Sequence, residues 1–267
     1  MTETSKMTET SGLYGSSKPL TQRIDAQARY GTRDLTAWFL DLAAPGPAEA
    51  VLDIGCGSGN HLIPFAKAAG SAVGIDSSEE LVASAQRAAR EASLDNVRVL
   101  VGSGDAFDLE GERFDIAMCN FAIYYMDAPR VIELLAAHLK PDGRAYVMGS
   151  PDENARELME IHGTATAYVP GVYAPGYSDV RKYEPAMRSS FAECVFHRFE
   201  NPVVFPSVEA FMSYYLGTTL FQASDGETED LEARIAAAAK GVFEEHGEVR
   251  VTKIVDTAEL RGPKAHG

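Results

Sequence analysis

The segment 51–59, with the sequence VLDIGCGSG, constrains the fold of this chain more than any other segment. It begins with a short apolar run of the kind found in buried strands, and glycines follow at once. Gly55, Gly57 and Gly59 allow the backbone to turn tightly between a strand and a helix. Because they lack side chains, a ligand can approach the main chain and the helix N-terminus. The sequence therefore predicts a strand–turn–helix unit with a ligand at the turn.

The alternation of apolar strands and amphipathic helices continues well beyond this turn. Expected strands cover 50–54, 72–75, 97–101, 114–120 and 145–148, and later 194–199 and 248–255. Expected helices cover 20–44, 62–69, 79–93, 127–139, 207–216 and 229–245, with Ser77-x-x-Glu80 as a capping box and Asp127 as an N-cap. Strands that alternate with helices favour a parallel sheet with right-handed crossovers. We predict an α/β fold with a Rossmann-like, doubly wound, mostly parallel sheet of seven strands.

The chain is predicted to contain one domain, residues 13–267, after a disordered N-terminus at 1–12. A helical segment at 13–47 is expected to cover the domain. After the fifth strand the alternation stops, and 151–190 contain a stretch rich in Pro, Gly and Tyr. We interpret 151–190 as an inserted lid over the ligand crevice, with an oligomer contact as the alternative.

Charge and cysteine content limit the partners and the compartment. The chain of 267 residues has 39 acidic and 24 basic residues, a net charge of −15, which repels nucleic-acid phosphates and anionic membranes. We therefore predict no nucleic-acid partner and no membrane partner, and leave a homo-oligomer open. Three widely spaced cysteines, no metal-ligand spacing and no signal peptide favour the cytoplasm and no bound metal.

An acidic residue, Asp76, ends the second expected strand. In this topology it lies at the carboxyl edge of the sheet beside the glycine turn, where a carboxylate can accept both hydroxyl protons of a ribose. The alternative is a solvated acid at the start of a helix. A dinucleotide-binding turn would have a third glycine at position 60, but this chain has Asn60. This mismatch disfavours an NAD(P)-dependent oxidoreductase.

The x-D-x-G-x-G-x-G form of the turn resembles the first motif of class I S-adenosylmethionine (SAM)-dependent methyltransferases of the small-molecule type. The segments Gly104-Asp105-Ala106, Asn120-Phe121 and 139–143 fit the same family, so the resemblance is strongest over 48–150. It implies SAM as cofactor and S-adenosylhomocysteine as product. The implied cofactor-binding residues are Asp53, Gly55, Gly57, Gly59, Asp76, Ser77, Asp105, Ala106 and Asn120, with Asp105 and the Ala106 N–H at the adenine.

Methyl transfer from a sulfonium requires mainly alignment of a nucleophile and, for some acceptors, removal of a proton. Tyr125 follows the fourth strand, where the family commonly places aromatic residues or histidines, and His162 is a candidate general base. Each has a packing role as its alternative. We predict transfer to an N, O or C atom of a small molecule, with a place in specialised metabolism. A SAM-binding regulatory or assembly protein without transferase activity is the alternative.

Overall fold

The structure is a computed structural model that describes residues 25, 26, 28–224 and 228–264. The chain divides into two compact units. Unit 1 comprises Met1–Asp34, Asp152–Tyr177 and Glu200–Ile254, and unit 2 comprises Leu35–Pro151, Ser178–Phe199 and Val255–Gly267. The segment 1–12, predicted to be disordered, lies outside the described residues.

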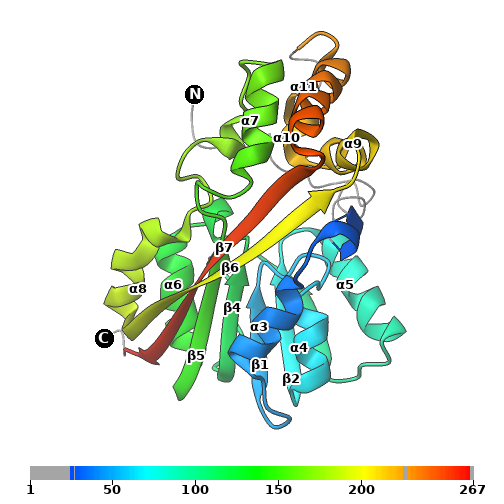
Figure 1. Ribbon diagram of the computed structural model, residues 1–267. Coiled ribbons are helices and arrows are strands. Elements are labelled where there is room, and N and C mark those ends of the chain that lie inside the picture. Colours follow the sequence, from blue (N-terminus) through cyan, green and yellow to red (C-terminus); the bar gives the residue numbers. More distant parts are fainter. Residues whose placement is uncertain (1–24, 27, 225–227, 265–267) are drawn as a thin grey trace. The chain divides into compact units, whose positions relative to one another are not determined.

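A sheet of seven strands forms within the described part of the chain. The strands are β1 (Ala50–Ile54), β2 (Ser71–Asp76), β3 (Val97–Val101), β4 (Phe114–Asn120), β5 (Leu139–Gly149), β6 (Phe191–Phe205) and β7 (Val249–Pro263) (Figure 1). They lie in the order β3-β2-β1-β4-β5-β7-β6. The strands β1 to β5 pair in parallel, and β7 runs antiparallel to β5. The predicted Rossmann-like, mostly parallel sheet is confirmed.

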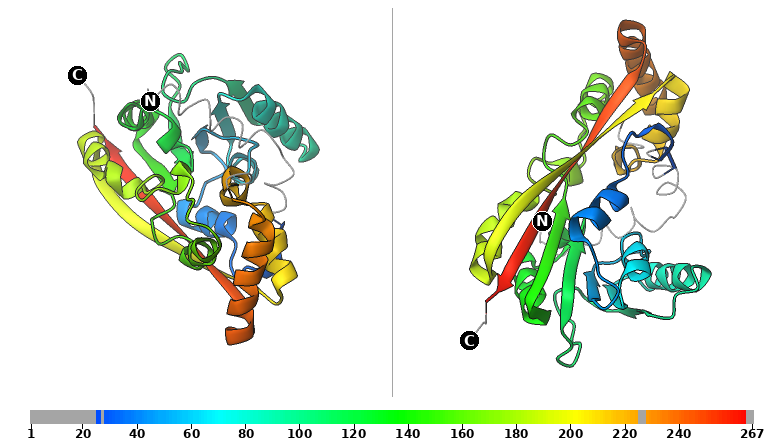
Figure 2. Two further views of the ribbon diagram at one scale, coloured as in Figure 1. Left: turned by 90° about the horizontal axis from the view of Figure 1, so that it is seen from above. Right: turned by 60° about the horizontal axis from the view of Figure 1, so that its bottom comes forward.

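Helices of unit 2 cover both faces of its part of the sheet (Figures 1 and 2). One core contains residues of α3 (Leu35–Ala43), α4 (Leu62–Ala68) and α5 (Glu79–Glu91). The core on the opposite face contains residues of α6 (Ala128–His138) and α8 (Glu184–Ser190). Two short 3-10 turns, η1 (Ile123–Tyr125) and η3 (Val180–Tyr183), complete this unit. This burial on both faces explains why the central strands β1, β2 and β4 are largely apolar.

Unit 1 has a core of its own. It contains α7 (Arg156–Ala165), η2 (Gly171–Tyr173), α9 (Val208–Leu216), α10 (Thr219–Ser224) and α11 (Leu231–His246). Phe205 packs against the rings of Phe211 and Tyr214 in this core. The range 151–190 is divided between the two units, and the predicted lid is not confirmed. No helix among the described residues is both long and apolar enough to cross a bilayer.

The two predicted helix caps had different outcomes. Asp127 is the N-cap of α6, because its side chain accepts from the Arg130 N–H at 3.2 Å, as expected. The capping box at Ser77 is wrong by one residue: Ser78 caps α5, and its Oγ accepts from the Leu81 N–H at 3.3 Å. The reason is that Asp76 Oδ1 accepts from the Ser78 N–H at 2.9 Å and so extends the turn by one residue.

The continuous helix predicted over 20–44 is also wrong in its middle. Helical residues between 25 and 30 are followed by a break, and α3 begins at Leu35. Asn201 Oδ1 accepts from the backbone N–H groups of Thr32 and Arg33 at 2.8 and 3.0 Å, and Gly31 forms a β-bridge with Val203. These contacts with a distant strand replace the helical hydrogen bonds.

Candidate functional site

The glycine turn follows β1 directly, and its three glycines have different roles. All three have positive φ angles: 72° at Gly55, 54° at Gly57 and 87° at Gly59. A Cβ atom on Gly55 would clash with Ala122, and one on Gly59 would lie 3.3 Å from the Ala85 Cβ. A Cβ atom on Gly57 would meet nothing within 4 Å. The backbone at Gly57 is therefore open to a ligand, while the other two glycines permit close packing.

Asp76 holds this turn in place. It ends β2, the strand beside β1, and its Oδ2 accepts from the Gly57 N–H at 2.8 Å. Its Oδ1 accepts from the Ser78 N–H, while Ser77 between them is exposed. An ionised carboxylate has about four acceptor positions, so these two bonds leave room for ligand hydroxyl groups. The structure thus brings Asp76, Ser77 and Gly57 together, as the sequence predicted.

Asp53 lies beneath the turn on β1. Its side chain is buried, and burial raises the pKa of this carboxyl well above its usual range, with a further contribution from the charge of Asp76. A carboxyl group whose pKa is higher in the folded chain than in the unfolded chain adds stability below the unfolded pKa, about 4. This stability is lost as the pH rises through the folded pKa.

We therefore expect the pH dependence of stability to change in an Asp53→Asn variant. The melting temperature of the ligand-free chain should fall less between pH 5 and pH 8 in this variant than in the wild type. Asp115→Asn is the matched control, because hydrogen bonds and the charge of Lys140 outweigh burial and lower the pKa of Asp115. It should destabilise the chain at neutral pH without altering this slope. If the melting temperature falls equally between pH 5 and pH 8 in Asp53→Asn and in the wild type, the raised pKa of Asp53 is contradicted.

Asp105 and Ala106 lie in the loop after β3. Ser103 Oγ donates to Asp105 Oδ1 at 2.5 Å, and the Asp127 N–H donates to Asp105 Oδ2 at 3.1 Å. These bonds lower the pKa of Asp105 and keep it charged. The Ala106 N–H donates to the Ser103 carbonyl at 3.2 Å, a bond that competes with the expected contact to adenine. The roles of both residues at the adenine stay predictions.

Asn120 ends β4, next to β1 in the sheet. Its side chain is only 7% exposed, and neither its amide oxygen nor its amide nitrogen has a hydrogen-bond partner among the described residues. A buried amide without partners costs free energy, so such a group indicates a ligand or an ordered water. The amide of Asn120 and the open backbone at Gly57 therefore offer polar groups at one edge of unit 2 that a polar cofactor would fit.

Met126, which no sequence motif indicated, and Phe121, from the segment Asn120-Phe121, also shape this edge. The Met126 side chain lies against Gly104, where a Cβ atom would clash with its sulfur. Phe121 has a φ angle of 56°, unusual for a residue with a side chain, and its N–H donates to the Met148 carbonyl at 2.9 Å. No pattern in the sequence distinguishes Met126 from an ordinary core residue.

The two candidate catalytic residues belong to different units. Tyr125 lies in η1 of unit 2, directly after β4, and its ring centroid is 4.6 Å from that of Tyr124. His162 lies in α7 of unit 1 and is fully buried. His162 Nε2 donates to the Tyr168 carbonyl at 2.8 Å, and the Tyr215 hydroxyl donates to Nδ1 at 2.7 Å. These contacts favour a packing role for His162, and its role as a base stays a prediction.

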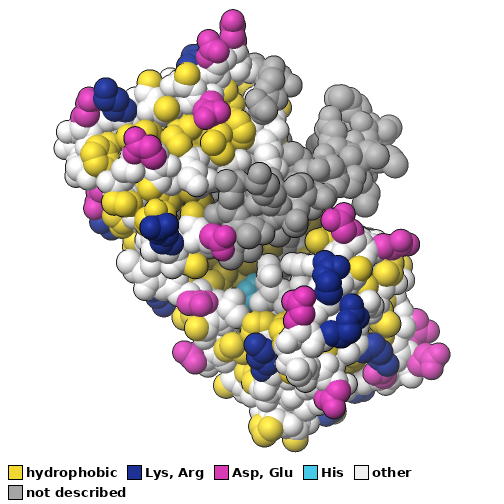
Figure 3. Space-filling model, turned by 90° about the vertical axis from the view of Figure 1, so that its right-hand side faces the viewer, with side chains coloured by type: hydrophobic (Ala, Val, Ile, Leu, Met, Phe, Trp, Pro, Cys, Tyr) yellow, Lys and Arg dark blue, Asp and Glu magenta, His cyan; other side chains and the backbone are white. Residues whose placement is uncertain are grey.

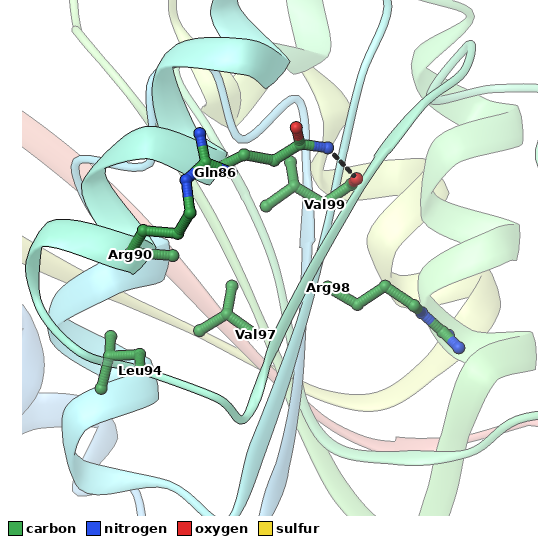
Figure 4. A pocket seen from close by; sticks show the side chains of 7 residues that line it. Gln86, Arg90, Leu94, Val97, Arg98 and Val99 are labelled. Atoms are coloured by element: carbon green, nitrogen blue, oxygen red, sulfur yellow. Dashed lines mark hydrogen bonds between the residues drawn. The ribbon is translucent and has the colours of Figure 1, made fainter.

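Other features of the surface do not compete with this site. Among the described residues, no group of His, Cys, Asp and Glu side chains could hold a metal ion. A hollow between α5 and β3 is lined by Gln86, Arg90, Leu94 and 97–99, none of which belongs to the predicted site (Figure 4). Figure 3 shows one face, on which Lys and Arg side chains lie among Asp and Glu side chains.

Comparisons with known proteins agree with this geometry. Residues 51–143 match the model of a family described as "Methyltransferase domain". The chain is 35% identical over 130 residues to nocamycin O-methyltransferase from Saccharothrix syringae, a match that covers 47% of this chain and 46% of that protein. The chain thus spans less than half the length of this relative.

Solved structures share the fold across most of the chain. The YcgJ protein from Bacillus subtilis superposes with a TM-score of 0.55 at 16% identity, covering 85% of this chain and 97% of YcgJ. The [4+2]-cyclase SpnF superposes with a TM-score of 0.54 at 21% identity, covering 86% of this chain and 81% of SpnF. At such identities the likeness concerns the fold alone.

The sheet order, the glycine turn and the family match agree over the part of the chain that the family model covers. Residues 51–143 are similar to methyltransferase domains, and the chain has the fold of methyltransferases of known structure. The family match begins in β1, includes the glycine turn and ends at Gly143 within β5.

Proposed function

We propose that this chain transfers the methyl group of SAM to an N, O or C atom of a small-molecule acceptor. The observation that carries the proposal is the arrangement at the carboxyl ends of β1, β2 and β4. There the open backbone of Gly57, the carboxylate of Asp76 and the unpartnered amide of Asn120 belong to one edge of unit 2. Ligands of doubly wound sheets bind at this edge, outside the carboxyl ends of the strands.

The cofactor residues follow from this arrangement. Asp76 would accept the ribose hydroxyl protons, with Ser77 beside it, and the turn from Gly55 to Gly59 would leave space for the ligand. Asp53, buried on β1 before the turn, would support the turn, and Asn120, Asp105 and Ala106 would line the remaining edge. When bound, SAM supplies an electrophilic methyl group, and S-adenosylhomocysteine is the product. The chain itself contributes alignment of the acceptor and exclusion of water.

The charge of the chain favours a small molecule over a nucleic acid as acceptor. Names of relatives do not decide this point, because they include an O-methyltransferase for nocamycin, an rRNA methyltransferase and a ribosomal protein methyltransferase. A net charge of −15 opposes a phosphate backbone and an anionic membrane. Specialised metabolism is the proposed setting, and the cytoplasm is the proposed compartment because all three cysteines are free and buried.

Tyr125 is the residue proposed to contact the acceptor. We expect Tyr125→Phe, which keeps the ring and removes the hydroxyl, to lower kcat more than tenfold with little change in SAM affinity. His162→Ala should instead lower the melting temperature, because it leaves the buried Tyr215 hydroxyl without its partner. Steady-state kinetics and thermal unfolding of both variants check this. Full activity of Tyr125→Phe would contradict a catalytic role of its hydroxyl and would mean that catalysis relies on alignment alone.

The alternative is a SAM-binding protein that transfers no methyl group. It has support from fold likeness, since SpnF, which shares the fold, is named a [4+2]-cyclase. Incubation with SAM labelled in its methyl group, together with a metabolite extract, separates the two functions. For a methyltransferase we expect label in a small molecule, in an amount that depends on Asp76. Retention of bound SAM without transfer to any metabolite would favour the regulatory or assembly protein.

A further inference from the structure

A buried carboxylate, Asp256, lies at the end of the parallel sheet. It is on β7, opposite Gly149, the last residue of β5, and its side chain is 0% exposed. Arg198 on β6 contacts both of its oxygens: Nε donates to Oδ1 at 2.8 Å and Nη2 donates to Oδ2 at 2.9 Å. This bidentate contact from one arginine already neutralises the buried charge.

A second arginine contacts the same carboxylate. Arg181 on η3 donates from Nε to Asp256 Oδ2 at 2.7 Å. Burial raises the pKa of Asp256, but the hydrogen bonds and charges of the two arginines outweigh it, so the pKa is lowered and the carboxylate is ionised at neutral pH. The three groups therefore carry a net charge of +1, in a chain whose net charge is −15. Neutralising Asp256 does not require this extra charge.

Arg181 is held in position by contacts within unit 2. Asp179 Oδ1 accepts from its backbone N–H at 2.8 Å, and its guanidinium carbon lies 4.4 Å from the centroid of the Phe196 ring. Its side chain is nevertheless 43% exposed. Within the described part of the chain, no residue accepts a hydrogen bond from its Nη groups. A fixed guanidinium with two available Nη groups binds an oxyanion with little loss of conformational entropy.

Arg181 lies close to the edge of the sheet formed by the carboxyl ends of the parallel strands. At Gly149, a Cβ atom would clash with the Ser178 carbonyl and the Val180 side chain, so the segment before Arg181 packs directly on the end of β5. The edge outside the carboxyl ends of the parallel strands is where an acceptor binds in folds of this type. Arg181 is therefore anchored at that edge, beyond the strands that hold the proposed cofactor residues.

We propose that Arg181 binds an oxyanion of the acceptor, a carboxylate or a phosphate, through its Nη groups, with Asp256 and Phe196 as the residues that position it. This inference rests on the proposed function, because it assigns the substrate class of the same site. Arg198 remains the partner of Asp256 when Arg181 is replaced, so the fold is expected to tolerate the change.

Titration of the chain with benzoate and with inorganic phosphate, each in a chloride buffer, tests the proposal. Arginine Nε–H signals in NMR spectra report the contact, and calorimetry reports the affinity. At least one anion should bind and shift the Arg181 signal. Arg181→Gln should weaken this binding at least tenfold. Arg181→Lys, which keeps the positive charge but loses the planar guanidinium, should weaken it less. The anion that binds more tightly indicates whether the acceptor carries a carboxylate or a phosphate.

Arg188→Gln is the matched control, because Arg188 is an exposed arginine of the next helix that also donates to a carboxylate, Glu184. It should bind the anions as the wild type does. If neither anion binds the wild type, or if Arg181→Gln binds as tightly as the wild type, the proposal is wrong. Titration with S-adenosylhomocysteine in the same samples separates this proposal from the proposed function. If S-adenosylhomocysteine binds and neither anion binds, the proposal for Arg181 is wrong and the proposed function stands. If an anion binds and S-adenosylhomocysteine does not, the proposed function is contradicted.

Discussion

A Gly57→Val variant is expected to lose measurable SAM binding while it keeps its fold. The backbone at Gly57 has a φ angle of 54°, and the space where a Cβ atom would lie is open within 4 Å. A valine there would occupy the proposed ligand space. It would also be strained, because the left-handed conformation costs a residue with a side chain about 1–2 kcal/mol. Thermal shift on addition of SAM, and calorimetric titration, measure the loss.

Gly111→Val separates the effect of backbone strain from the effect of filling the proposed ligand space. Gly111 also has a positive φ angle, 82°, and open space around its Cβ position, but it lies in the loop between β3 and β4. Its replacement should cause similar backbone strain and leave SAM affinity unchanged. If Gly57→Val retains the thermal shift with SAM, or if both variants lose it equally, the turn does not hold the cofactor as proposed.

An Asp76→Ala variant is expected to bind SAM much more weakly than the wild type. Each charge-assisted hydrogen bond lost costs about 1.5–3 kcal/mol, or roughly ten- to a hundredfold in affinity per contact. The structure adds a second reason, because Asp76 also accepts from the Gly57 and Ser78 N–H groups and so shapes the turn. Calorimetric titration with SAM gives the change in affinity, and thermal unfolding gives the change in stability.

Asp115→Ala is the control for the structural part of this effect. Asp115 Oδ2 also accepts from a backbone N–H, that of Ala50, at 2.8 Å, but at the opposite end of β1 from the glycine turn. This variant should lose stability and keep its SAM affinity. An unchanged affinity in Asp76→Ala would contradict the ribose assignment.

The sequence predicted the parts of the fold that depend on local patterns. The strand β1, the glycine turn and α4 follow from an apolar run, three glycines and a helical period that are close together in the sequence, and all occur where expected. Site residues that directly follow or end a strand, such as Gly57 and Asp76, could be predicted because the carboxyl ends of the strands in this topology meet at one edge of the sheet. Their contact, the 2.8 Å hydrogen bond, connects the turn after β1 to the end of the adjacent strand β2.

Features that depend on distant residues could not be predicted in this way. The break between the helical residues near 30 and α3 depends on Asn201, which is 169 positions from Thr32 in the sequence. The pair of Arg181 and Asp256 joins residues 75 positions apart, and each alone is an ordinary charged residue. A histidine such as His162 can act as a general base, but its hydrogen bonds with Tyr215 and Tyr168 depend on packing that no local sequence pattern predicts.

The central claim, a SAM site at the carboxyl ends of β1, β2 and β4, is tested most directly by calorimetric titration of the purified chain with S-adenosylhomocysteine and, in parallel, with NAD. We expect one-to-one binding of S-adenosylhomocysteine that is lost in Gly57→Val and preserved in Gly111→Val, and no binding of NAD. Binding of NAD in place of S-adenosylhomocysteine, or no binding of S-adenosylhomocysteine by the wild-type chain, would contradict the claim.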